Sequence, residues 1–201
     1  KTIFEEYYIA QDRVAFDKEE DSQFTLSEVQ QAALDSIQEN FKTFDVNLLH
    51  GVTASGKTEI YIKLLEQYIK EGKQVLFLLP EIALTTQLVQ RLTAYFGNEV
   101  AVFHSKYTNN ERIEVWNQVL ENSPKAKVVI GVRSALFLPF SNLGCIIVDE
   151  EHEQTFKQHD PAPRYHARDA AIVLAKQHGA KVVLGSATPS LETYYNVQSK
   201  K

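Results

Sequence analysis

Short apolar runs recur along most of the chain and alternate with longer amphipathic stretches. Each run is too short to form a helix and contains few polar residues, which is typical of a strand buried on both faces. The longer stretches, near residues 58–71, 84–96, 110–121 and 166–178, carry apolar residues at helical spacing. This alternation predicts an α/β fold in which helices cover both faces of a mostly parallel central sheet. The six predicted strands are Val46–Leu49, Gln74–Leu79, Val100–Phe103, Val128–Val132, Cys145–Val148 and Val182–Leu184.

One more helix pattern begins near Ser27, a residue type that caps helix N-termini well. The residues before it differ from the rest, because a short apolar run is followed by an acidic, polar stretch that is typical of a linker. We therefore assign residues 1–22 to the end of a preceding module and its linker, and residues 23–201 to one domain. Because the chain begins with Lys1 and contains no methionine, we expect it to be part of a longer protein.

Composition places the chain among ordinary globular proteins, with 44% hydrophobic and 23% charged residues. No apolar run approaches the roughly 18–20 residues that a membrane span needs. The single cysteine, Cys145, excludes a disulfide framework and a cysteine-built zinc site within this chain. The one tryptophan, Trp116, shares a predicted helix with Ile113 and Leu120, and we expect it to pack in the core.

The net charge of −5 would argue against nucleic-acid binding if it were spread over the whole chain. Residues 1–30 hold 8 of the 26 acidic and 3 of the 21 basic side chains. The remaining residues are therefore balanced, with 18 charges of each sign. The acidic excess belongs to the N-terminal stretch, so charge does not exclude a nucleic-acid partner for the predicted domain.

The strongest motif follows the first predicted strand and precedes a predicted helix. It fits the pattern G-x-x-x-x-G-K-[ST] in full, in the context that a phosphate-binding loop requires. Its glycines let backbone N–H groups surround phosphates, its lysine reaches the terminal phosphates, and the hydroxyl of its last residue ligates Mg²⁺. The sequence therefore predicts a site for ATP and Mg²⁺. The loop residues are Gly51, Val52, Thr53, Ala54, Ser55, Gly56, Lys57 and Thr58.

A second motif, Asp149-Glu150-Glu151-His152, directly follows the fifth predicted strand. A carboxylate at this position is the usual second half of a phosphate-loop site, and we expect Asp149 to hold Mg²⁺ together with Thr58. Glu150 can orient and polarise an attacking water, which favours ATP hydrolysis.

A third motif, Ser186-Ala187-Thr188, ends the sixth predicted strand. Small hydroxyl side chains there can sense the phosphate site and couple it to another surface. We expect His152 to bridge the nucleotide site to this motif.

The order of these motifs resembles that of the superfamily 2 helicases. Between the first and second motifs lie Pro80-Glu81-Ile82-Ala83-Leu84-Thr85 and Gly131-Val132-Arg133-Ser134-Ala135-Leu136-Phe137. Within that superfamily the chain is similar to the primosomal replication-restart helicases, the PriA family. The similarity is most specific in Arg164-Tyr165-His166-Ala167-Arg168-Asp169 and in Leu184–Thr193, and it covers about residues 24–198.

The resemblance implies that the chain is the first of two RecA-like motor lobes of a 3′→5′ DNA helicase. It implies action on single-stranded and forked DNA in replication restart, with primosome proteins and single-stranded-DNA-binding protein as partners and a cytoplasmic location. The second lobe, its arginine finger and the zinc-binding cysteines of the family lie outside this sequence. We therefore expect the lobe alone to be nearly inactive in hydrolysis.

The resemblance also suggests roles for single residues. Gln30 lies where related helicases carry a glutamine that reads adenine, although a solvated glutamine at a helix start remains an alternative. Two segments that follow strands would face single-stranded DNA and contact its phosphates. For Arg133 a surface salt bridge remains open. The residues concerned in these two segments are Pro80, Glu81, Thr85, Arg133 and Ser134.

In the family, the loop after the second motif couples DNA binding to ATP hydrolysis. Here it would supply aromatic rings for base stacking and basic groups for the DNA backbone. These residues are Phe156, Lys157, Arg164, Tyr165 and Arg168. The loop departs from some members at its tip, where Asp160-Pro161-Ala162-Pro163 replaces a tryptophan, so one stacking group is missing.

Two other functions stay open from the sequence. One is a lobe of a different superfamily 2 translocase, of the restriction or fork-reversal type, against which Arg164–Asp169 argues. The other is a DNA-binding module that ATP switches without turnover, against which Glu150 argues.

Overall fold

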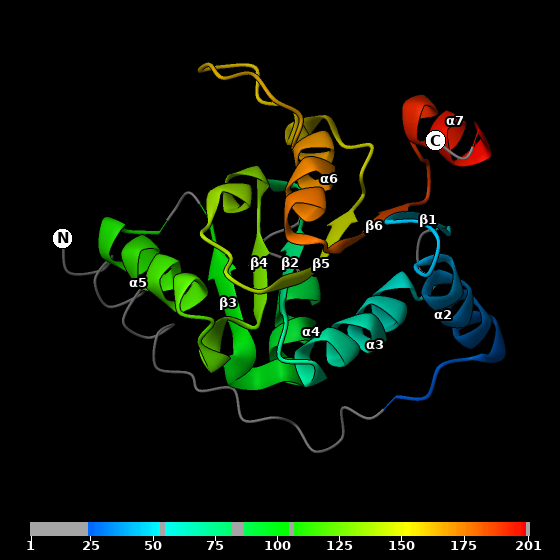
Figure 1. Cartoon of the computed structure of the whole chain (residues 1–201), viewed down its shortest axis with the longest axis horizontal. Helices are drawn as coiled ribbons and strands as arrows, with labels where there is room; N and C mark the ends of the chain where they lie inside the picture. Colours follow the sequence, from blue (N-terminus) through cyan, green and yellow to red (C-terminus); the bar gives the residue numbers. More distant parts are fainter. Residues whose placement is uncertain (1–23, 53–54, 82–86, 105–106, 200–201) are drawn as a thin grey trace.

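The computed structural model describes residues 24–52, 55–81, 87–104 and 107–199 (Figure 1). The predicted N-terminal module over residues 1–22 lies outside these ranges. Three predicted site residues, Thr53, Ala54 and Thr85, also lie outside them.

Six parallel strands form one sheet in the described residues, in the order β1-β6-β5-β2-β4-β3. β2, β4, β5 and β6 are almost wholly buried, because helices cover both faces of the sheet. The predicted sheet is confirmed, and all six predicted strands are present within a few residues. The strands are β1 (Val46–His50), β2 (Gln74–Leu78), β3 (Val100–Phe103), β4 (Val128–Gly131), β5 (Leu143–Asp149) and β6 (Lys181–Ser186).

Two apolar clusters, one on each face of the sheet, make up the core. On one face, α2 (Glu28–Asn40), α3 (Lys57–Lys70) and α4 (Gln87–Phe96) pack against the strands, and on the other, α5 (Asn109–Leu120) and α6 (Ala167–His178) do so (Figure 1). A last helix, α7 (Leu191–Ser199), was not predicted and lies beside β1 (Figure 1). The described part of the chain also contains the short 3₁₀ turns η2 (Gly97–Glu99), η3 (Pro124–Ala126), η4 (Arg133–Phe137) and η5 (Gln154–Phe156).

Local signals define the ends of the predicted helices. Ser27 caps α2 with a full capping box, in which the side chains of Ser27 and Gln30 each bond the other's backbone N–H. At the C-terminus of α6, Gly179 takes the left-handed conformation, with φ of 64°. None of the helices in the described ranges combines the length and the apolar character that a membrane span requires.

The expectation that Trp116 packs in the core is wrong. Trp116, Ile113 and Leu120 are 45%, 58% and 51% exposed, because α5 turns Val115 and Val119 toward the sheet instead. Both sets of residues have helical spacing, so periodicity alone could not decide which one faces inward.

The parallel order brings the carboxyl ends of all six strands to one edge of the sheet. The segments that follow β1, β2, β4, β5 and β6 carry the predicted motifs, and this edge is where open α/β sheets bind ligands.

Candidate functional site

The phosphate-binding loop follows β1 and leads directly into α3, as predicted. Gly56 is the N-cap of α3 in the left-handed conformation, with φ of 82°, and no side chain caps the helix. The first N–H groups of α3 therefore have no side-chain cap, and a helix start of this kind favours anions. A Cβ on Gly51 would lie 2.8 Å from Ser55 Oγ, and one on Gly56 would overlap the amide of Gln30. The left-handed conformation of Gly56 favours glycine there, and at both positions a side chain beside the loop would have to move to make room for a Cβ.

Lys57 lies between this loop and the end of β5. Its Nζ donates a hydrogen bond to Gly51 O at 2.8 Å and lies 3.9 Å from Glu150 Oε1. The sheet thus places the predicted lysine and the predicted catalytic carboxylate in reach of each other, although 93 positions separate them in the sequence. Thr58 follows in the first turn of α3 and is partly buried.

Asp149 ends β5, and a tyrosine that the sequence analysis missed holds it. Tyr61 is fully buried on α3, and its Oη donates a hydrogen bond to Asp149 Oδ1 at 2.9 Å. Burial raises the pKa of Asp149, while the Tyr61 hydrogen bond lowers it in part and the Glu150 charge raises it further. Burial also raises the pKa of Tyr61, which stays a donor at neutral pH. A divalent cation at this carboxylate would stabilise its charged form, so the site fits Mg²⁺.

Glu150 adopts an unusual backbone conformation at the strand end. Its φ is 50°, a region that non-glycine residues seldom occupy and that persists where the surrounding structure imposes it. One carboxylate oxygen faces Lys57 Nζ at 3.9 Å, and the other lies 3.7 Å from His152 Nδ1. The side chain is about one-third exposed, which leaves the carboxylate open to water.

His152 contacts the Ser186–Thr188 motif at the end of β6. His152 Nδ1 lies 2.7 Å from Ser186 Oγ, and Nε2 lies 3.3 Å from Thr188 Oγ1. Ala187 contributes its carbonyl oxygen, 3.2 Å from His50 Nε2. The structure therefore brings the predicted coupling residues together, and their role in coupling stays a prediction.

Gln30 lies beside the phosphate-binding loop, but both ends of its amide have protein partners. Its Oε1 accepts from Ser27 N at 2.8 Å, and its Nε2 donates to Gly56 O at 3.4 Å. Adenine recognition would require the side chain to exchange these partners, and it stays a prediction.

The segments after β2 and β4 meet at Arg133. Arg133 Nη2 lies 3.7 Å from Glu81 Oε1, so the surface ion pair that was left open is present. Its Nη1 donates to Thr155 O at 3.1 Å and to Lys157 O at 3.3 Å. Arg133 thus anchors the entrance of the loop after the second motif. Of the other predicted residues here, Pro80 is buried and Ser134 is partly buried.

The loop over residues 157–166, which we call the coupling loop, projects away from the body of the lobe (Figure 1). A bridge between Lys157 and His166 and a hydrogen bond from Gln158 N to Tyr165 O at 2.9 Å close its base. Lys157 and Arg164 are exposed, as phosphate contacts require. Tyr165 is partly buried, and its ring meets that of Phe137 edge to face at a centroid distance of 5.3 Å.

Two predicted DNA contacts are contradicted. Phe156 is 1% exposed and belongs to the core, because η5 turns its ring toward the sheet, so it cannot stack on a base. Arg168 is buried, and its guanidinium bonds Glu151, Asp169 and Ser190 instead of facing solvent. Phe137, 60% exposed beside Tyr165, offers the accessible ring that the sequence analysis assigned to Phe156.

Two further residues of the site, Tyr61 and Glu151, were not predicted from the sequence. Tyr61 lies four residues after Lys57, so helical spacing puts both on one face of α3. Glu151 directly follows Asp149 and Glu150, the two residues of its motif with a predicted chemical role. Its complete burial could not be predicted, because glutamate side chains are mostly exposed.

Comparison with known proteins agrees with this geometry. The model of the DEAD/DEAH box helicase family matches residues 27–197. Among curated proteins, the chain is 55% identical over 158 residues to the replication restart protein PriA of Haemophilus influenzae, covering 79% of this chain and 21% of that protein. It is 47% identical over 175 residues to PriA of Bacillus subtilis, covering 86% of this chain and 21% of that protein. The chain thus spans about a fifth of the length of these relatives.

Solved structures show the same fold at lower identity. A structure of RecG bound to a three-way DNA junction matches with a TM-score of 0.63 and 22% identity, over 98% of this chain and 24% of that one. The UvsW helicase from bacteriophage T4 matches with a TM-score of 0.60 and 17% identity, over 98% of this chain and 64% of that one. The expected RecA-like α/β fold is confirmed.

Proposed function

Because the chain belongs to the DEAD/DEAH box helicase family, we propose that it is the ATP-binding motor lobe of a replication restart helicase of the PriA type. The observation that carries this proposal is the convergence of Lys57, Asp149 and Glu150 on one phosphate-binding loop. A lysine for phosphates, a carboxylate for Mg²⁺ and a carboxylate for water are the set that hydrolysis of ATP requires.

The loop and the first turn of α3 would hold the phosphates of ATP, and Lys57 would exchange Gly51 O for the terminal phosphates. Thr58 and Asp149 would supply oxygen ligands to Mg²⁺, which neutralises phosphate charge when bound. Glu150 would orient the attacking water and accept its proton. On the family resemblance alone, we propose that zinc belongs to parts of the longer protein outside this chain.

Lys57→Ala tests nucleotide binding in this chain directly. Loss of a charge-assisted hydrogen bond of about 1.5–3 kcal/mol is expected to weaken the affinity for Mg·ADP by about 10-fold or more. Titration with a fluorescent ADP analogue measures the change. Lys70→Ala, at the exposed end of the same helix, is the control and should leave the affinity unchanged. Equal affinity in the chain and in Lys57→Ala would contradict the proposed role of the loop.

We further propose that Gln30 selects adenine once nucleotide is bound. Its position against Gly56, at the entrance of α3, supports this role.

For the longer protein we propose 3′→5′ unwinding of forked and single-stranded DNA in the cytoplasm, with primosome proteins and single-stranded-DNA-binding protein as partners. The support is the sequence identity to proteins that are named replication restart protein PriA. The DNA surface of the lobe would run from Ser134 and Phe137 to the coupling loop. There, Lys157 and Arg164 are exposed for phosphates, and Phe137 and Tyr165 offer rings for bases.

Shortening the coupling loop tests its role in the enzyme that contains both motor lobes. Deletion of residues 161–165 is expected to lower the stimulation of ATP turnover by single-stranded DNA several-fold, because each lost stacking contact is worth about 1–3 kcal/mol. ATP affinity should change little, since the deleted residues lie outside the phosphate-binding loop. Turnover measured with and without oligo-dT gives the ratio. Equal stimulation with the intact and the shortened loop would rule out coupling through it.

A further inference from the structure

A cluster of charged and hydroxyl side chains lies buried next to the Asp149–Glu150 pair, and the proposed chemistry does not use it. At its centre, Glu151 is 0% exposed. Glu151 Oε1 accepts from Ser190 N at 2.7 Å, and Oε2 accepts from Arg168 Nη1 at 3.0 Å and from Thr193 Oγ1 at 2.9 Å. We call these four residues the Glu151 junction.

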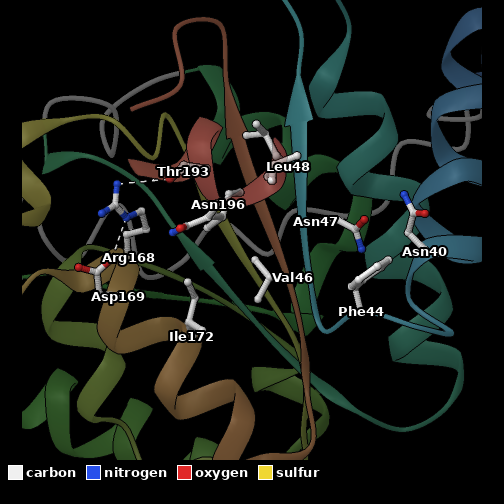
Figure 2. Close-up of a pocket in the computed structure, with 12 residues that line it drawn as sticks. Asn40, Phe44, Val46, Asn47, Leu48, Arg168, Asp169, Ile172, Thr193 and Asn196 are labelled. Carbon is white, nitrogen blue, oxygen red and sulfur yellow. Dashed lines mark hydrogen bonds and ion pairs between the residues drawn. The ribbon is translucent and has the colours of Figure 1, made fainter. Parts of the chain in front are cut away.

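The partners of Glu151 come from two different functional segments. Arg168 lies in the first turn of α6, two residues after the coupling loop ends at His166. Ser190 and Thr193 lie at the start of α7, directly after the Ser186–Thr188 motif. Figure 2 shows Arg168 pointing from α6 toward Thr193 and Asp169. One buried carboxylate therefore touches both the exit of the coupling loop and the segment after the third motif.

The junction also holds the start of α7 by hydrogen bonds, while the helix lies beside β1. Thr193 is the only buried residue of this helix, while Leu191 and Val197 are 85% and 46% exposed. Beyond the junction, a pocket of about 430 Å³ separates α7 from α6, with Val46 and Leu48 of β1 among its lining residues (Figure 2). Contact between the two helices is thus concentrated in hydrogen bonds rather than in apolar packing.

The buried ion pair between Glu151 and Arg168 makes the junction sensitive to a movement of α6 or α7. A buried carboxylate is stable only while its charge and its acceptor sites are paired, so withdrawal of Arg168 would leave Glu151 unpaired in the interior. Glu151 cannot shift alone, because its N–H donates to Gly185 O at 3.0 Å and its chain neighbour is Glu150. A movement of α6 or α7 must therefore reach the end of β5.

We propose that Glu151 is a positioning residue through which the coupling loop and α7 adjust the Asp149–Glu150 pair. The inference rests on the proposed function, because Glu151 would connect the proposed DNA surface to the proposed ATP site of the same lobe. When DNA shifts the exit of the coupling loop, Arg168 moves with it, and Glu151 transmits the shift to the catalytic strand end.

Three variants separate this role from simple structural support. Glu151→Gln removes the buried counter-charge of Arg168 and leaves only the exposed Asp169, so it is expected to destabilise the fold. The double variant Glu151→Gln/Arg168→Gln removes both charges and should recover most of the lost melting temperature, because no buried charge stays unpaired. Asp169→Asn is the matched control, since it removes a carboxylate from the same arginine on the exposed side.

Hydrogen exchange of the whole 201-residue chain, with Mg·ADP as the probe, gives the readout. In the unmodified chain and in Asp169→Asn, Mg·ADP should slow exchange in residues 167–170 and 191–196 by about 3-fold or more, a local change in opening free energy. In the double variant the slowing should be confined to the phosphate-binding loop and α3. The proposal would be overturned if Mg·ADP slowed exchange in residues 167–170 and 191–196 of the double variant as much as in the unmodified chain. It would also be overturned if Mg·ADP did not slow exchange there in the unmodified chain.

The same experiment distinguishes failure of the inference from failure of the proposed function. If Mg·ADP does not bind the chain, the ATP-binding function fails. Hydrogen exchange of the unmodified chain and of Glu151→Gln, both measured without nucleotide, still tests the junction. There, Glu151→Gln should speed exchange at the end of β5, at the start of α6 and at the start of α7 together. Faster exchange at only one of the three segments would show that Glu151 does not join them.

Discussion

Replacing Gly185 with alanine is expected to destabilise the lobe by about 3 kcal/mol or more, at the upper end of what overpacking costs. Gly185 lies in β6, directly before the third motif and between Leu49 of β1 and Asp149 of β5 in the sheet, and a Cβ there would overlap Tyr61 Oη and approach Asp149 Oδ1 to 3.1 Å. Neither neighbour can yield cheaply, because Tyr61 is fully buried in the core and its hydroxyl bonds Asp149. Urea denaturation of the chain, followed by circular dichroism, measures the loss of unfolding free energy.

The variant Tyr61→Phe supplies the matched partner for a double-mutant cycle. Without the hydroxyl, the overlap at Gly185 shrinks to a contact of 2.9 Å with the ring carbon that carried it, so the double variant should regain part of the stability lost in Gly185→Ala. Tyr61→Phe alone is expected to cost about 1.5–3 kcal/mol, the value of a hydrogen bond to a charged group. If the double variant lost the sum of the unfolding free energies lost in the two single variants, the Tyr61 hydroxyl would not be what excludes a side chain at Gly185.

The sheet and the nucleotide half of the site could be predicted from the sequence, because both depend on local patterns. Buried strands are short apolar runs wherever they lie, and the six runs marked the strands to within a few residues. The phosphate-binding loop works through its own backbone and the helix that follows, so its pattern carries its geometry. The contact of 3.9 Å between Lys57 and Glu150 then follows from parallel strand order.

The DNA half could not be predicted to the same depth, because there the direction of a side chain decides its role. Arg168 and Phe156 stand among basic and aromatic residues, a pattern that favours nucleic-acid contact. The first turn of α6 aims Arg168 at Glu151, and η5 aims Phe156 at the core. The two partners in the ion pair are 17 positions apart, and neither residue type alone signals burial.

The start of α7 was missed for a related reason. Leu191–Ser199 contains few apolar residues that turn inward, and only Thr193 is buried. Hydrogen bonds to Glu151, rather than an apolar face, hold its first turn. Hydrophobic periodicity cannot reveal a helix that is attached in this way.

Replacing Glu150 with glutamine is expected to lower ATP turnover of the two-lobe enzyme by about 10²–10⁴-fold, the range that a positioned general base contributes. The amide keeps the size of the side chain but can no longer accept a proton from water. Binding of ATP should persist, because Lys57, Asp149 and the phosphate-binding loop are unchanged. Unwinding of a forked duplex should be lost together with turnover, since hydrolysis drives it.

Glu153→Gln is the matched control for this variant, because it removes a carboxylate three residues away that makes no capping hydrogen bond. Steady-state phosphate release, ATP affinity and fork unwinding would be measured for both variants with and without single-stranded DNA. Loss of turnover in Glu150→Gln alone, at unchanged ATP affinity, is the result expected of a motor. Full unwinding by Glu150→Gln would instead favour a lobe that ATP binding switches without turnover, or a different group as the base.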